Sequence, residues 1–220
     1  MQPKAKICGI STPEVAFAAL DDNAGIKADL LGFIHFEKSP RHITLDTMAE
    51  LMSVIRAKTD KARLVSVVVD PSDDLLAQLN HVVKPDLIQL HGHETPKRVS
   101  EIASRWGVPL IKAISVRDAS DLSVAPHYEP HVEYLMFDAK TPEGSPLPGG
   151  LGLSFDWALM RQFVGKKDWF LAGGLTPANV ATAIHASGAP MVDVSSGVEY
   201  APGVKDVGLI SDFLRAVKSL

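Results

Sequence analysis

The sequence is poor in cysteine, and Cys8 is its single example. One thiol cannot form a disulfide within the chain, and it cannot supply a metal site built from several cysteines. A chain without disulfides suits a reducing compartment, so we expect a cytoplasmic protein. We assign no metal ligands.

Neither sign of charge dominates, and long hydrophobic runs are missing. The formal net charge is -4 at pH 7, which gives no overall attraction to nucleic acid or to an anionic membrane surface. No stretch approaches the apolar length of a membrane span, and residues 1–6 lack the apolar core of a signal peptide. We therefore expect no nucleic-acid partner and no membrane partner, and local groups must hold any anionic ligand.

The sequence also lacks low-complexity segments and any shift in composition that would mark a domain boundary. Its 220 residues, 46% of them hydrophobic, are enough for one α/β barrel with a stable core. We predict a single domain over residues 1–220.

Short apolar runs alternate with helical patterns along the chain. The run 63–69 is nearly continuous in valine and leucine, as expected for a parallel strand covered on both faces. The segment 117–124 is a weakly patterned helix, and 139–153 is a long loop of a kind that is usually functional. The alternation predicts a closed (β/α)8 TIM barrel. We predict strands at 6–10, 29–36, 63–69, 86–91, 109–114, 134–137, 169–172 and 191–194, and helices at 12–20, 45–57, 73–80, 96–105, 117–124, 176–186 and 208–218.

Reactive side chains stand where predicted strands end. In a parallel barrel the site is built at the C-terminal ends of the strands. Cys8 ends the first strand, His91 the fourth and Asp138 the sixth. The Cys8 and Asp138 side chains would then face each other across the mouth of the barrel.

Two glycine turns follow the last two strands. Gly173 and Gly174 follow the seventh strand, and Ser195, Ser196 and Gly197 follow the eighth. Barrels frequently bind phosphate here through backbone N–H groups, and glycine lets the backbone approach an anion closely. The alternative is a pair of tight turns without a ligand, but two such turns on consecutive late strands favour phosphate binding.

Six motifs follow one another along nearly the whole chain. They are Lys6-Ile7-Cys8-Gly9-Ile10, Gly32-Phe33 with Lys38-Ser39-Pro40-Arg41, Gln89-Leu90-His91-Gly92, Phe137-Asp138-Ala139-Lys140, Ala172-Gly173-Gly174-Leu175 and Asp193-Val194-Ser195-Ser196-Gly197-Val198-Glu199. Each motif is weak to moderate alone, but in this order they resemble the phosphoribosylanthranilate isomerase family.

The resemblance implies a cofactor-free Amadori rearrangement in tryptophan biosynthesis. The substrate would be N-(5-phosphoribosyl)anthranilate and the product 1-(2-carboxyphenylamino)-1-deoxyribulose 5-phosphate. In such enzymes an aspartic acid protonates the furanose ring oxygen to give an open Schiff base, and a cysteine thiolate then takes the C2 proton. Carried over, Asp138 is the acid and Cys8 the base. The base needs surroundings that stabilise a thiolate, and the acid needs a site that keeps it protonated.

The resemblance also implies binding residues. Arg41 matches the contact to the anthranilate carboxylate, which a guanidinium can engage with two N–H donors. Gly150 and Gly152, with Gly149, match glycines close to the phosphate. Their loop also contains Pro142, Pro146 and Pro148, which make it stiff and leave open whether it closes over substrate.

Two further assignments keep two interpretations each. His91 either contacts the substrate or is a structural histidine. Asp193 either orients a catalytic or phosphate-binding group or anchors its loop. Lys38 supports its loop rather than contacting substrate.

Three other functions are compatible with a phosphate-binding barrel. An indole-3-glycerol-phosphate synthase would use a catalytic lysine and glutamates, and no such early-strand pattern stands out. An aminoaldose isomerase of histidine biosynthesis would show two similar half-barrels, whereas only the second half here carries the glycine turns. A sensor or scaffold that only binds a sugar phosphate has no need of both Cys8 and Asp138. A monomer and a homodimer are both compatible with the sequence.

Overall fold

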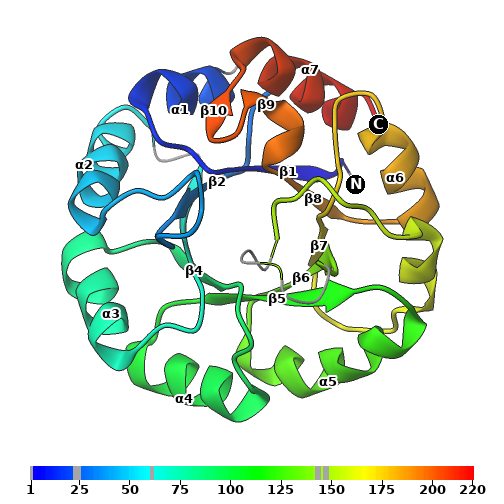
Figure 1. The fold of residues 1–220 in the computed structure, drawn as a ribbon, viewed down its shortest axis with the longest axis horizontal. Helices are drawn as coiled ribbons and strands as arrows, with labels where there is room; N and C mark the ends of the chain where they lie inside the picture. Colours follow the sequence, from blue (N-terminus) through cyan, green and yellow to red (C-terminus); the bar gives the residue numbers. More distant parts are fainter. Residues whose placement is uncertain (1, 22–25, 60–61, 142–144, 146–148) are drawn as a thin grey trace.

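Eight parallel strands close into a barrel that a ring of helices surrounds (Figure 1). The architecture is that of a computed structural model, which describes residues 2–21, 26–59, 62–141, 145 and 149–220. Each strand pairs with the next along the chain, and β8 pairs with β1 to complete the ring. The predicted (β/α)8 barrel is confirmed. The strands are β1 (Lys4–Cys8), β2 (Leu30–Ile34), β3 (Arg63–Val68), β4 (Leu87–Leu90), β5 (Leu110–Val116), β6 (Tyr134–Ala139), β7 (Trp169–Leu171) and β8 (Met191–Val194).

Hydroxyl side chains fix where several helices begin. Thr12, Thr44, Ser72 and Thr95 each accept a hydrogen bond from the backbone N–H three residues later. These caps satisfy N–H groups that the first turn of a helix leaves without a partner. The α-helices are α1 (Pro13–Leu20), α2 (Leu45–Arg56), α3 (Asp73–Gln78), α4 (Pro96–Trp106), α5 (Ala125–Tyr128), α6 (Val180–Ser187) and α7 (Val207–Lys218).

The connections after β5 and β6 differ from the prediction. The segment 117–124 forms a 3₁₀ helix, Ala119–Val124, that runs directly into the single turn of α5. Another 3₁₀ helix, Trp157–Gln162, follows the long loop, where the sequence predicts no helix. Both are too short to show the 3.6-residue apolar repeat by which a helix is found in a sequence.

Two further differences concern the end of the chain. Helix α6 begins at Val180 rather than Thr176, because the Asn179 side chain accepts the N–H of Thr176 and donates to the carbonyl of Gly174. These bonds form a turn before the helix starts. Beyond β8 a small hairpin, β9 (Glu199–Ala201) and β10 (Val204–Lys205), lies outside the barrel sheet and is absent from the prediction.

Alternate residues of each strand face two different cores, one between the strands and the helices and one inside the barrel. Outward side chains such as Ile7 and Phe33 pack against the helices, while inward side chains such as Val65 and Met136 fill the barrel. This division follows from the two-residue repeat of a strand. Lys6 also faces inward and is fully buried, so the interior carries charge beneath the barrel mouth.

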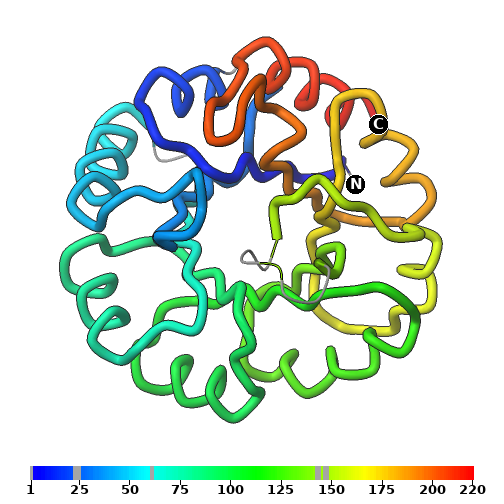
Figure 2. The backbone as a smooth tube through the Cα atoms, viewed as in Figure 1, coloured from blue at the N-terminus to red at the C-terminus, as the bar shows by residue number. Residues whose placement is uncertain are grey.

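The chain runs once around the barrel and returns to its start (Figure 2). The Lys218 ammonium donates to the Pro3 carbonyl at 3.1 Å and to the Asp29 carboxylate at 2.8 Å. These bonds fasten the end of α7 to the residues just before β1 and β2. Among the described residues, no helix is long and apolar enough to cross a membrane.

Candidate active site

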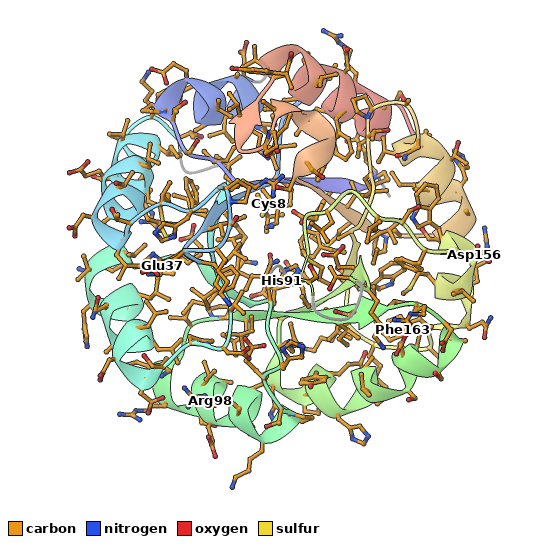
Figure 3. The ribbon with its side chains drawn as sticks, viewed as in Figure 1. Cys8, Glu37, His91, Arg98, Asp156 and Phe163 are labelled. Atoms are coloured by element: carbon orange, nitrogen blue, oxygen red, sulfur yellow. The ribbon has the colours of Figure 1, made fainter. Side chains whose placement is uncertain are left out.

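A pocket opens at the C-terminal ends of the barrel strands. Figure 3 shows Cys8 and His91 well inside the ring of helices. Side chains and loops from strands all around the barrel meet there, although they are far apart in the sequence. Each residue that the sequence predicts for the site lines this pocket: Cys8, Arg41, His91, Asp138, Gly150, Gly152, Gly173, Gly174, Asp193, Ser195, Ser196 and Gly197.

Cys8 ends β1 with its side chain turned into the barrel, and it is 4% exposed. Burial raises the pKa of its thiol, although the ammonium of Lys6 opposes this rise. Asp193 adds to the rise and Lys205 opposes it. The surroundings therefore favour the thiol, and the thiolate that a base role requires depends on the two lysines.

Lys6 lies beneath Cys8 on the same face of β1. Its Nζ donates to Asp193 Oδ1 at 2.8 Å across the β1–β8 pair. A Cβ built on Gly32 would lie 2.8 Å from Cys8 Sγ and 2.9 Å from Lys6 Nζ, so this glycine leaves room for thiol and ammonium to approach each other. Burial alone would lower the pKa of Lys6. The negative charges of Asp193 and of an ionised Cys8 outweigh burial, so the pKa of Lys6 is raised. Asp193 thus orients a charge next to Cys8.

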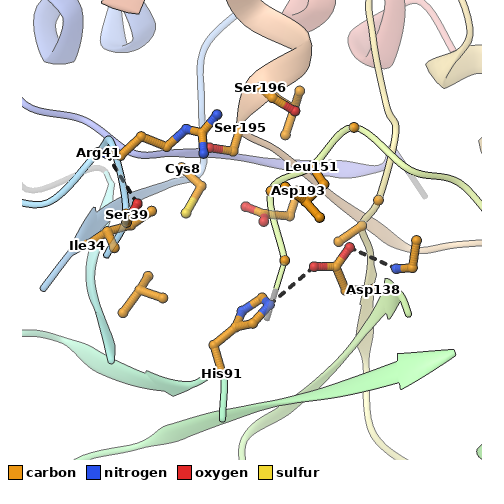
Figure 4. Close-up of a pocket in the computed structure, with 18 of the residues that line it drawn as sticks. Cys8, Ile34, Ser39, Arg41, His91, Asp138, Leu151, Asp193, Ser195 and Ser196 are labelled. Atoms are coloured by element: carbon orange, nitrogen blue, oxygen red, sulfur yellow. Dashed lines mark hydrogen bonds and ion pairs between the residues drawn. The ribbon is translucent and has the colours of Figure 1, made fainter. Parts of the chain in front are cut away.

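Asp138 lies on β6 and is held by two N–H donors. Its Oδ2 lies 3.1 Å from His91 Nε2, and its Oδ1 accepts the N–H of Ala139 at 2.8 Å (Figure 4). Gln89 Nε2 lies 2.8 Å from His91 Nδ1. When the Gln89 amide donates to Nδ1, the imidazole proton sits on Nε2 and points at Asp138. His91 therefore contacts the predicted acid directly, in addition to lining the pocket.

The long loop after β6 returns to the pocket at Gly149. A Cβ there would lie 2.6 Å from Asp138 Oδ2 and 2.8 Å from His91 Nε2, so the position has no room for a side chain. At Gly150, whose φ is +75°, a Cβ would lie 3.0 Å from Nη1 of Arg41. Pro142, Pro146 and Pro148 lie outside the described residues, so the predicted stiffness of the loop stays a prediction.

The two glycine turns pack against each other and against the acid. Gly173 has a φ of +85°, and a Cβ there would lie 2.9 Å from Asp138 Oδ1. A Cβ on Gly197 would overlap the carbonyl oxygen of Leu175, at 1.8 Å. Close backbone approach therefore requires glycine in both turns. The two turns therefore place closely packed, partly buried backbone beside Asp138.

Arg41 belongs to the loop between β2 and α2, and its guanidinium is buried against Glu199. Nε and Nη2 of Arg41 donate to the two oxygens of Glu199, each at 2.7 Å. Glu199 also accepts from Lys205 Nζ at 2.7 Å. Burial favours the neutral form of Glu199, but Arg41 and Lys205 outweigh it and lower the pKa of the carboxyl. Lys38 in the same loop is exposed, consistent with a supporting role.

One protein-family model matches nearly the whole chain. The model described as N-(5'phosphoribosyl)anthranilate (PRA) isomerase matches residues 5–216. The chain belongs to the phosphoribosylanthranilate isomerase family. As the sequence predicts, it is an isomerase of tryptophan biosynthesis that acts on N-(5'-phosphoribosyl)anthranilate.

Individual phosphoribosylanthranilate isomerases agree with this assignment over their full length. The enzyme of Caulobacter vibrioides is 50% identical over 97% of this chain and 95% of its own. That of Brucella canis is 48% identical over 96% and 92%. The crystal structure from Thermotoga maritima is 32% identical, with a TM-score of 0.83 over 99% of this chain and 100% of that one. A second structure, in complex with reduced 1-(o-carboxyphenylamino)-1-deoxyribulose 5-phosphate, is 29% identical, with a TM-score of 0.80 and the same coverage.

Sequence reasoning missed three charged residues of this phosphoribosylanthranilate isomerase site: Lys6, Glu199 and Lys205. Lys6 lies on β1, two residues before Cys8. Its ammonium lies beneath the pocket in an ion pair with Asp193. The available signals were the spacing of two between Lys6 and Cys8, which puts both on one face of a strand, and the presence of Glu199 in the last motif.

Proposed function

We propose that Cys8 and Asp138 carry out the two proton transfers of the isomerisation, Cys8 as general base and Asp138 as general acid. The observation that carries the proposal is their placement on different sides of one pocket (Figure 4). A substrate lying between them would meet one group at the furanose ring oxygen and the other at C2. These are the positions of the first two proton transfers of the reaction.

The proposed steps balance without an added oxidant or reductant. The Asp138 carboxyl gives its proton to the ring oxygen as the C1–O bond breaks, which leaves a protonated Schiff base between C1 and nitrogen. The Cys8 thiolate then removes the C2 proton, and the electron pair of that bond forms the C1=C2 bond of an enolamine. The enolamine becomes the ketone when C1 gains a proton and the C2 hydroxyl loses one. Positioned acids and bases of this kind typically contribute about 10²- to 10⁴-fold each.

The proposed binding residues divide between the two anionic ends of the substrate. Backbone N–H groups of Gly173, Gly174, Ser196 and Gly197 suit a phosphate, because glycine turns let an anion come close. Gly150 and Gly152 lie on the neighbouring loop. The free edge of the Arg41 guanidinium suits the carboxylate. The related structure with a bound carboxyphenylamino-deoxyribulose phosphate supports a ligand that has both groups.

His91 and Asp193 act on the catalytic pair rather than only on the substrate. We assign His91 to holding the Asp138 carboxyl through the 3.1 Å contact, and Asp193 to holding Lys6 beside Cys8. Both residues line the pocket, so contact with substrate remains part of the proposal.

A cytoplasmic location and an oligomeric state also remain proposals. A related structure consists of monomers made from the dimeric isomerase of Thermotoga maritima, which is compatible with either a monomer or a homodimer here. Light scattering on the purified chain distinguishes the two, and cell fractionation tests the location.

Replacement of the base tests the proposed roles. We expect Cys8→Ser to lower kcat by about 10²-fold or more, because a hydroxyl is far less acidic than a thiol. Affinity for reduced 1-(o-carboxyphenylamino)-1-deoxyribulose 5-phosphate, measured by calorimetry, should stay within about threefold of the parent value, since Cys8 does not bind either anionic end. Near-normal kcat in this variant would remove Cys8 from the base role.

A further inference from the structure

The buried Glu199 carboxylate accepts hydrogen bonds from three residues. It accepts Nε and Nη2 of Arg41, Nζ of Lys205 and the N–H of Gly203 at 3.1 Å. The side chains of Glu199, Arg41 and Lys205 are 4%, 5% and 0% exposed. Charged pairs this well shielded from water are far more rigid than ion pairs on a surface.

Lys205 extends this arrangement to the turn after β8. Its Nζ donates to the Ser195 carbonyl at 2.9 Å and to Ser195 Oγ at 3.3 Å. Through Glu199 and Lys205, the β9–β10 hairpin therefore joins Arg41, on the loop after β2, to the start of the Ser195-Ser196-Gly197 turn. Figure 4 shows Arg41 and Ser195 beside each other at one edge of the pocket.

Gly9 leaves space for the side chains of Arg41 and Lys205. Its φ is +84°, and a Cβ there would lie 2.9 Å from Arg41 Cδ and 3.2 Å from Lys205 Nζ. The backbone just past β1 thus lets both cationic side chains cross close above it.

The contacts leave one edge of Arg41 for a ligand. Glu199 uses Nε and Nη2, while Nη1 faces the loop at Gly150 and the pocket. Arg41 and Lys205 carry two positive charges and Glu199 carries one negative charge, so one positive charge is left for an anion. An arginine held in advance loses less side-chain freedom when it binds a carboxylate.

We propose that Glu199 and Lys205 are positioning residues that fix Arg41 relative to the phosphate turn, and so select a substrate with a carboxylate and a phosphate at a set separation. The inference rests on the proposed function, in which Arg41 takes the carboxylate and the turns take the phosphate. Glu199 governs the carboxylate end, and Lys205 couples that end to the phosphate end.

Calorimetry with two ligands tests the proposal. One ligand is reduced 1-(o-carboxyphenylamino)-1-deoxyribulose 5-phosphate, and the other is the same compound with phenyl in place of carboxyphenyl. We expect Glu199→Gln to lower the affinity for the carboxylated ligand about tenfold or more. The Arg41 guanidinium would be displaced and would no longer align with the ligand carboxylate. The phenyl ligand should bind within about twofold of its parent affinity, since it does not use Arg41. Glu199→Asp, whose carboxylate is one methylene shorter, should give the same selective loss if Glu199→Gln does not fold.

A control breaks a two-bond arginine–glutamate pair at the other end of the barrel, where the side chains of Arg63 and Glu133 are 36% and 35% exposed. Glu133 accepts both Nη atoms of Arg63, the first residue of β3, far from the pocket. Glu133→Gln should leave both ligand affinities unchanged, whatever it does to thermal stability. Lys205→Met should lower the affinities for both ligands, and the affinity for the carboxylated ligand should fall more.

The outcomes separate the inference from the function on which it rests. The positioning role would be overturned if Glu199→Gln lowered the affinities for both ligands equally, or lowered neither. Arg41→Gln is the separate check on the proposed function. If that variant kept the full preference for the carboxylated ligand, Arg41 would not be its partner, irrespective of the result at Glu199.

Discussion

At the scale of single residues, the chemistry depends on opposed effects on one thiol. Burial disfavours the Cys8 thiolate, and Lys6 is the first influence that opposes burial. Lys6 is itself kept charged by Asp193, whose Oδ1 accepts a hydrogen bond from the Lys6 ammonium at 2.8 Å. The proposed base is therefore a group of three side chains rather than a cysteine alone.

Removal of the Lys6 charge should shift the pH dependence of turnover. An ammonium beside a thiol lowers the thiol pKa, so Lys6→Met raises the pKa of Cys8 further and leaves less thiolate at any given pH. We expect the rising limb of kcat/KM against pH to move to higher pH, with the largest loss of rate on the acid side. The rate of Cys8 alkylation by iodoacetamide should shift in the same direction.

Lys6→Arg is the matched control for this prediction, because it keeps the positive charge. An alkylation profile that is the same for Lys6→Met and the parent chain would show that Lys6 does not govern Cys8. A profile shifted equally in both variants would point to altered packing instead of charge.

The sequence could predict residues that lie in local patterns but not those paired over long range. Cys8 and Asp138 stand at the ends of apolar runs, so their place in the barrel mouth followed from the strands. Glu199 and Lys6 find their partners 158 and 187 residues away in the chain. Their burial depends on contacts that no local pattern contains, and a lone lysine or glutamate is otherwise read as a surface charge.

At the scale of elements, loops add to what the strands place at the proposed catalytic site. The loop after β6 packs its backbone at Gly149 onto the Asp138–His91 pair. We expect Gly149→Ala to separate Asp138 from His91 and to lower kcat, because the added Cβ would lie 2.6 Å from Asp138 Oδ2. Steady-state kinetics checks the effect on kcat. An unchanged kcat would show that the contact is not needed for catalysis.

The loop after β4 is held by a buried ion pair. Lys112 on β5 donates to Glu94 at 2.7 Å and to the Gly92 carbonyl at 2.8 Å, and Glu94 accepts the N–H of Asp70 at 2.9 Å. The two side chains are 3% and 2% exposed. We expect Lys112→Met to lower the free energy of unfolding by about 3–5 kcal/mol, because Glu94 would keep a buried charge without its partner.

Urea unfolding measures this loss, and an exposed pair provides the control. Lys97 and Glu101 lie 4.0 Å apart on the surface of α4, with Lys97 88% exposed. Lys97→Met should leave the urea midpoint almost unchanged, since surface ion pairs contribute little. Equal midpoints for the two variants would contradict the role of the Lys112–Glu94 pair.

Most elements were predictable because their signals are local and strong. Strands β3 and β8 are buried apolar runs, and α1 and α4 begin at a threonine cap followed by proline. The 3₁₀ helix after β6 and the β9–β10 hairpin were not, because short elements have too few residues to show a repeat. The helix predicted at 117–124 is present, but as a 3₁₀ helix. The hairpin matters most, since it carries Glu199 and Lys205.

At the scale of the whole molecule, the barrel explains why distant motifs form one site. Every strand points its C-terminal end at the same mouth, so motifs spread from Lys6 to Glu199 meet there once β8 pairs with β1. The order of motifs in the sequence therefore predicted the family, the fold and the pocket together. The ion pairs beneath and beside the pocket, Lys6–Asp193 and Arg41–Glu199–Lys205, could be identified only in the structure.

This barrel isomerises phosphoribosylanthranilate, and we propose that Asp138 is the acid. The most direct test follows the loss of phosphoribosylanthranilate fluorescence after addition of purified protein, with the parent chain and Asp138→Asn measured side by side. Thermal unfolding confirms that both are folded. We predict rapid loss with the parent chain and a rate at least about 10²-fold lower with Asp138→Asn. Equal rates for the two folded proteins would contradict the account.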